Sequence, residues 1–198
     1  MLSSFEKTDT NDELPKNMYQ KFAVQKVEWK GFPVFIIRNR NKEKRGKKAI
    51  LFLAGANLAF SLVHRMKKRP GKLIVISPAP GLENGKDRSI RKAMENIDPI
   101  LNVEMNDLIA ENWAKNVPLD SPDINPEYID YHNFPKILML YGSHELFYPH
   151  VKRLIRKIRE DGAMLETIEK PMCHDWALCS FFPEGRRAMK KMREFILE

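Results

Sequence analysis

The sequence is poor in cysteine and in long apolar runs. Cys173 and Cys179 are its only cysteines, too few for the disulfide framework of a small secreted domain, and they favour a reducing compartment. The longest apolar runs, such as residues 49–53, have the length of a strand and not of a membrane-spanning helix. The first residues also lack the basic head and the apolar run of a signal peptide. We therefore expect a cytoplasmic protein with no membrane span.

Motifs that would bind a cofactor, a metal or a nucleic acid are also missing. The polar side chains grouped near the C-terminus do not have the spacing of a common zinc site; they are Cys173, His174, Asp175 and Cys179. The formal net charge is +8, but much of the excess lies on the polar faces of predicted helices, and no nucleic-acid-binding motif accompanies it. We expect no metal, no cofactor and no nucleic-acid partner, and the oligomeric state stays open.

The hydropathy pattern predicts strands that alternate with helices. Residues 21–29 and 32–37, joined by a turn with Gly31, are typical of an antiparallel hairpin. Four further apolar or alternating runs predict strands, and 3.6-residue periodicity predicts helices between and after them. The predicted strands are 49–53, 72–77, 136–141 and 163–169, and the predicted helices are 87–96, 103–116, 149–161, 183–197 and one from Asn57 that stops before Pro70.

This order predicts an α/β fold with a mostly parallel sheet, helices on both of its faces and an N-terminal antiparallel hairpin. The strand, helix and strand between residues 49 and 77 form a βαβ unit, whose strands run parallel. Residues 1–17 are predicted to be a loosely ordered polar leader. Residues 18–198 are then expected to form a single domain.

Three stretches together resemble the hormone-sensitive-lipase-like esterases of the α/β-hydrolases. The first is Gly55-Ala56-Asn57 with the helix and strand that follow, which is similar to the family's nucleophile helix. The second is Asn125-Pro126 followed by the run from Phe134 to Glu145. The third contains Cys173-His174-Asp175-Trp176 and ends at Phe182-Pro183-Glu184. Their order along the chain is that of the family.

The resemblance implies a role for two residues. It gives the place of the acid of a catalytic triad to Glu145 and the place of its histidine to His174. The fold implied is a shortened α/β-hydrolase. The activity implied is hydrolysis of a carboxylic ester, with a small acyl ester or another apolar molecule as ligand.

The serine end of that triad is missing. Aligned on Gly55 and Asn57, the chain has Leu53 where the family has its nucleophilic serine, and leucine has no atom that could form an acyl-enzyme. The His-Gly-Gly segment that supplies oxyanion donors in the family is absent as well. We interpret both losses as one internal deletion, with its junction near residues 53–56.

The other candidate nucleophiles are poorly placed. Ser61 lies within a predicted helix, Ser77 ends a strand before Pro78, and Cys173 is adjacent to the histidine that would have to activate it. Whether the chain is an enzyme therefore stays open.

Three hypotheses follow. The first is a feeble esterase, which works through an unidentified nucleophile or through a water activated by His174. The second is a pseudoenzyme that binds a small apolar ligand or a partner near His174, Trp176 and Phe181. The third is a damaged product whose exposed strand edges associate. We favour an esterase-like protein with little or no catalysis.

Overall fold

The structure is a computed structural model that describes residues 16–29, 32–39, 49–52, 56–82 and 86–198. The chain divides into two compact units, Met1–Gly46 and Lys47–Glu198. Most of the predicted leader, and residues 53–55 of the predicted deletion junction, lie outside the described residues. The single domain over residues 18–198 stays a prediction.

The first unit holds the predicted hairpin. A short helix, α1 (Lys16–Lys21), precedes strands β1 (Phe22–Trp29) and β2 (Phe32–Asn39). The two strands pair antiparallel, in a register that runs from Phe22 opposite Asn39 to Trp29 opposite Phe32. The alternation of apolar and polar side chains therefore predicted this element correctly.

The second unit contains a four-stranded parallel sheet in the order β3-β4-β5-β6. The parallel sheet confirms the predicted fold class, and each strand begins and ends within two residues of its prediction. The strands are β3 (Ala49–Phe52), β4 (Lys72–Ile76), β5 (Lys136–Gly142) and β6 (Leu165–Lys170).

The predicted helices are present too. They are α2 (Ala56–Arg65), α3 (Lys86–Met94), α4 (Val103–Ala114), α5 (Tyr148–Glu160) and α6 (Pro183–Leu197), with 3₁₀ turns η2 (Pro126–Tyr128) and η3 (Trp176–Leu178). Gly162 follows α5 with a φ of 81°, a backbone conformation that glycine adopts without strain and that commonly follows the end of a helix. None of the helices in the described ranges combines the length and the apolar character that a membrane crossing requires.

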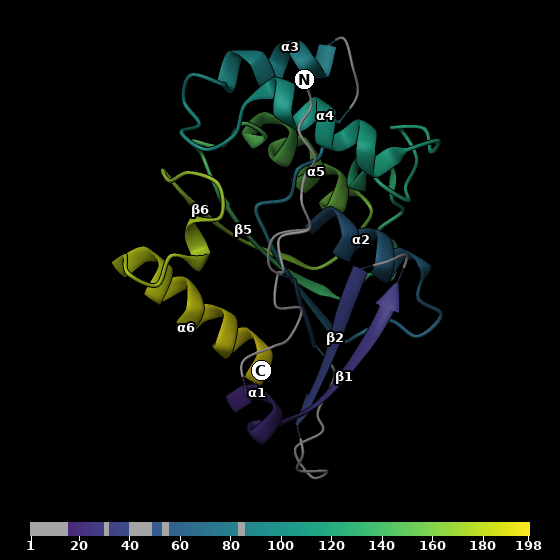
Figure 1. Cartoon of the computed structure of the whole chain (residues 1–198), viewed down its shortest axis with the longest axis vertical. Coiled ribbons are helices and arrows are strands. Elements are labelled where there is room, and N and C mark those ends of the chain that lie inside the picture. Colours follow the sequence, from purple (N-terminus) through teal and green to yellow (C-terminus); the bar gives the residue numbers. More distant parts are fainter. Residues whose placement is uncertain (1–15, 30–31, 40–48, 53–55, 83–85) are drawn as a thin grey trace, which may run out of the picture. The chain divides into compact units, whose positions relative to one another are not determined.

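Alternating side chains of the parallel strands form two cores, one on each face of the sheet. Leu73 and Val75 of β4 pack with apolar residues of α2 and α5. Ile74 and Ile76 face the other way and pack with η3 and α6. The sheet thus has helices on both faces, with α5 and α6 on opposite sides of β5 (Figure 1).

A leucine in the second core gives a test of this arrangement. Leu140 of β5 is fully buried, so the change Leu140→Ala should lower the free energy of unfolding by about 2–5 kcal/mol through lost burial and a new cavity. Urea unfolding measures the loss. Leu197→Ala is the matched control, because this side chain is 74% exposed and its removal should cost less than about 0.5 kcal/mol. Equal costs for the two changes would contradict the two-faced core.

Candidate functional site

The carboxyl ends of three neighbouring strands bring the site residues together. Ser77 follows β4, Glu145 lies in the loop after β5, and His174 lies in the loop after β6. In parallel sheets these ends share one edge, where loops of distant sequence meet. The backbone N–H of Ser77 still bonds to the carbonyl oxygen of Leu140, at 2.8 Å, so the sheet pairing holds Ser77 against β5.

Glu145 is the centre of the site, and its side chain is fully buried. One carboxylate oxygen, Oε1, accepts hydrogen bonds from the Ser77 hydroxyl, at 2.8 Å, and from the backbone N–H of Gly142. The other, Oε2, lies 3.3 Å from Nδ1 of His174. The structure thus brings Glu145 and His174 together, as the family resemblance implies for an acid and its histidine.

The surroundings of His174 favour the charged imidazolium. Burial alone would lower its pKa, but the hydrogen bond to Glu145 and the negative charges of Glu145, Asp175 and Asp98 outweigh burial. The pKa of His174 is therefore raised above its ordinary value near 6.5.

Asp175 occupies the other side of the ring. Its Oδ2 lies 3.8 Å from Nε2 of His174, within ion-pair distance, and its backbone N–H donates to the Ser77 hydroxyl oxygen at 3.0 Å. Burial raises the pKa of Asp175, and the positive charge of His174 only partly offsets this. In a working triad Nε2 accepts the proton of the nucleophile, so a carboxylate at this place differs from that arrangement.

Both candidate serine nucleophiles form hydrogen bonds to groups other than His174. Ser77 donates its hydroxyl proton to Glu145, and Ser61 is buried in α2 and donates to the carbonyl oxygen of Asn57 at 3.0 Å. Burial raises the pKa of the Cys173 thiol, which makes a thiolate there less available. Leu53 lies outside the described residues.

Comparison with known proteins identifies the family. The sequence pattern of the family described as alpha/beta hydrolase fold matches residues 37–178. The chain belongs to the α/β-hydrolase fold family. A comparison with curated proteins gives no match.

Solved α/β-hydrolases have the same fold. The chain resembles a proposed esterase from Staphylococcus aureus (24% identity, TM-score 0.68) over 79% of its own length and 55% of that protein. It resembles an esterase of the bacterial hormone-sensitive lipase family (21%, 0.67) over 75% of its length and 52% of that protein. It also resembles an esterase/lipase from an uncultured bacterium (17% identity, TM-score 0.69) over 92% of its own length and 90% of that protein. The chain thus spans about half the length of the first two α/β-hydrolases, and at these identities the likeness shows the fold alone.

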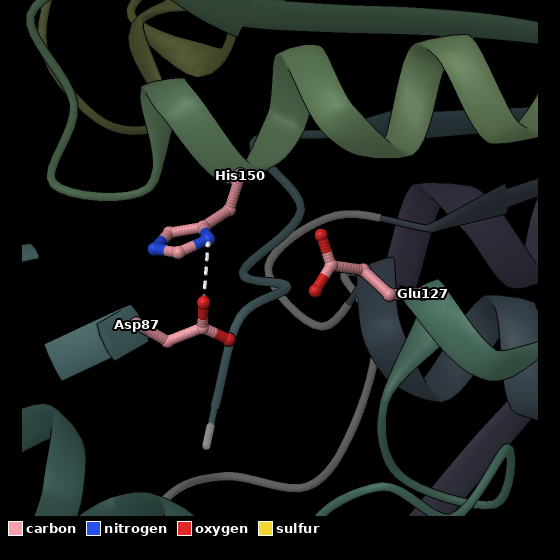
Figure 2. Close-up of side chains that lie close together, drawn as sticks. All are labelled: Asp87, Glu127 and His150. Carbon is pink, nitrogen blue, oxygen red and sulfur yellow. Dashed lines mark ion pairs between the residues drawn. The ribbon is translucent and has the colours of Figure 1, made fainter. Parts of the chain in front are cut away.

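A second cluster of ionisable side chains lies away from this edge. Asp87 at the start of α3, Glu127 in η2 and His150 in α5 point their polar atoms toward one another (Figure 2). Sequence analysis missed this cluster, because its members are far apart in the chain and share no motif. Among the described residues, it is one of two groups that could hold a metal ion; the other, Asp130, His132 and Asp161, is mostly exposed.

The guanidinium of Arg153 balances the negative charges of the cluster formed by Asp87, Glu127 and His150. It donates to both oxygens of Glu127, at 2.6 Å each, and to Asp87 at 3.1 Å. Burial lowers the pKa of His150 to about 4, so this ring is neutral at neutral pH. We therefore interpret the cluster as an ion-pair network that joins α3, η2 and α5, and not as a metal site.

Removing this guanidinium tests the interpretation. Arg153→Leu should lower the free energy of unfolding by about 1–3 kcal/mol, because the side chains of Asp87 and Glu127, each 9% exposed, lose their charged donor. Urea unfolding gives the value. Arg156→Leu, on an exposed position of the same helix, should change it by less than about 0.5 kcal/mol. If the cluster were instead a metal site, Mn²⁺ or Zn²⁺ would raise the melting temperature of the unmodified protein, and this result would contradict the interpretation.

Proposed function

We propose that this α/β-hydrolase retains the acid–histidine pair of an esterase but hydrolyses esters feebly or not at all. One observation carries the proposal. Ser77, which lies at the site, donates a hydrogen bond from its hydroxyl to Glu145 and not to His174. Nε2 of His174 faces the carboxylate of Asp175. Formation of an acyl-enzyme requires a hydroxyl or thiol whose proton the histidine can accept.

The sequence around residue 53 supports the same proposal. Leu53 stands at the position of the family's nucleophile, and the oxyanion segment is not found beside it. Strand β3 ends at Phe52 and helix α2 begins at Ala56, so three residues separate the elements that the family resemblance assigns to the oxyanion strand and the nucleophile helix. This short connection supports an internal deletion of the serine-bearing interval.

The alternative within this proposal is a binding module for a small apolar molecule or a partner. Of the residues named for it from the sequence, Phe181 is 72% exposed, and Phe182 beside it is 42% exposed. Trp176 is only 1% exposed and packs in the core with α6, so it supports the loop and does not offer a binding surface. A small acyl ester remains the ligand class that the family suggests, with Glu145 and His174 in the roles of acid and base.

Turnover of p-nitrophenyl acetate and butyrate tests the proposal. We expect the purified protein to release p-nitrophenol no faster than His174→Ala and Glu145→Ala variants, because the pair has no nucleophile to activate. Substantial turnover that both variants abolish would overturn the proposal and would assign an active triad to Glu145 and His174.

One control separates catalysis from background. Any exposed imidazole can attack p-nitrophenyl acetate slowly, and the His132 side chain is 67% exposed. A His132→Ala variant therefore measures how much of a low rate comes from this surface histidine. Thermal unfolding of each variant shows whether a lower rate of hydrolysis comes from loss of the folded structure.

A further inference from the structure

The loop that carries His174, residues 171–182, lies directly on the backbone of the loop after β5. A Cβ atom on Gly142 would lie 2.0 Å from the carbonyl oxygen of Met172, so only glycine allows the two segments to approach this closely. The backbone N–H of His144 donates to the same carbonyl oxygen at 3.2 Å. The start of this histidine loop is thus attached through contacts that do not change with pH.

The middle of the histidine loop is attached through side chains. The Ser77 hydroxyl accepts from the N–H of Asp175 and donates to Glu145, which links the loop to the ends of β4 and β5. The ring of His174 has a carboxylate oxygen at each nitrogen, 3.3 Å from Nδ1 and 3.8 Å from Nε2. A neutral imidazole can donate its one N–H to Glu145, but only the charged imidazolium can also form the ion pair with Asp175.

The charged groups that act most strongly on the ring are all acidic. Glu145 faces the ring from the loop after β5. Asp98, in the segment between α3 and α4, contributes its negative charge, and its carboxylate accepts a hydrogen bond from the N–H of Leu146 at 2.7 Å. On the histidine loop itself, Asp175 is the charged neighbour, and the Cys173 thiol is uncharged because burial raises its pKa. Loss of the imidazolium proton would leave these carboxylates close together without the charge that His174 provides.

We propose that Glu145, His174 and Asp175 form a proton-dependent clasp, which holds the histidine loop on the sheet while the ring is charged and loosens when the ring becomes neutral. The clasp goes beyond the proposed function, since it involves no ester and holds whether or not one is cleaved. The loop also carries buried apolar residues: Trp176 and Ala177 belong to the second core, together with residues of β4, β5 and α6. Loosening would expose this part of the second core.

The direction of the pH effect follows from proton linkage. The pKa of His174 is raised in the closed loop, so the stabilisation by the clasp is fully present below about pH 6.5, the ordinary value, and is lost as pH rises through the raised pKa. Each unit by which the closed loop raises the pKa corresponds to about a tenfold change in the equilibrium between closed and open loop.

Hydrogen exchange and histidine NMR on the full chain test the clasp. We expect the His174 ring to titrate above about pH 6.5. We expect the protection of the amides of Asp175 to Cys179, expressed relative to the unstructured exchange rate at each pH, to fall across the same titration. Amides of α5 should keep their protection. Asp175→Asn, which removes one of the two carboxylates, should lower the pKa of His174 and move the loss of protection to lower pH.

The matched control is His132→Gln, which removes an exposed histidine that also lies beside an aspartate, with Nδ1 2.6 Å from Asp130. This change should leave the pH dependence of the histidine loop unaltered, whereas His174→Gln should abolish it. A His174 pKa at or below the ordinary value, or loop protection that does not vary with pH, would overturn the clasp. Neither readout depends on ester turnover, so failure of the clasp is distinguishable from failure of the proposed function.

Discussion

The site depends on a single buried carboxylate. Glu145 is fully buried and meets three segments of chain: the Ser77 hydroxyl after β4, the backbone N–H of Gly142 in β5, and the ring of His174 after β6. A buried carboxylate without such donors would be costly, so each partner offsets part of the desolvation of the charge. The parallel register makes this possible, since Ile76 pairs with Leu140 and Gly142 with Lys170, which places the three strand ends at one edge.

The backbone near this carboxylate adopts conformations that the local sequence does not favour. Ser77 and Asp175 have φ values of 43° and 58°, in the left-handed region where a non-glycine residue costs about 1–2 kcal/mol. Each of them takes part in the bond between the Asp175 N–H and the Ser77 hydroxyl. Tertiary hydrogen bonding therefore outweighs local preference at two positions, and both face the same charged pair.

The sequence predicted the framework better than the site. The run from Leu73 to Ile76 is buried throughout, as a continuous apolar strand between two helical layers should be. The pairing of Glu145 with His174 was expected only through the family resemblance. The contact of Asp175 with Ser77, across 98 positions, and that of Arg153 with Asp87, across 66, could not be predicted. Hydropathy periods indicate which face of an element is buried, but not which polar side chain it will meet on another element.

The same contacts give the pair a structural role that does not depend on catalysis. Replacing His174 by an apolar residue would leave Oε2 of Glu145 buried without that donor, at a cost of about 1–3 kcal/mol. Replacing Glu145 would leave both the Gly142 N–H and the Ser77 hydroxyl without their acceptor. Stability alone can therefore maintain an acid and a histidine at this edge, and their presence in an α/β-hydrolase indicates descent without requiring turnover. The position of Nε2 distinguishes a structural histidine from a catalytic one. A catalytic histidine directs Nε2 at a nucleophile, whereas His174 directs it at the carboxylate of Asp175.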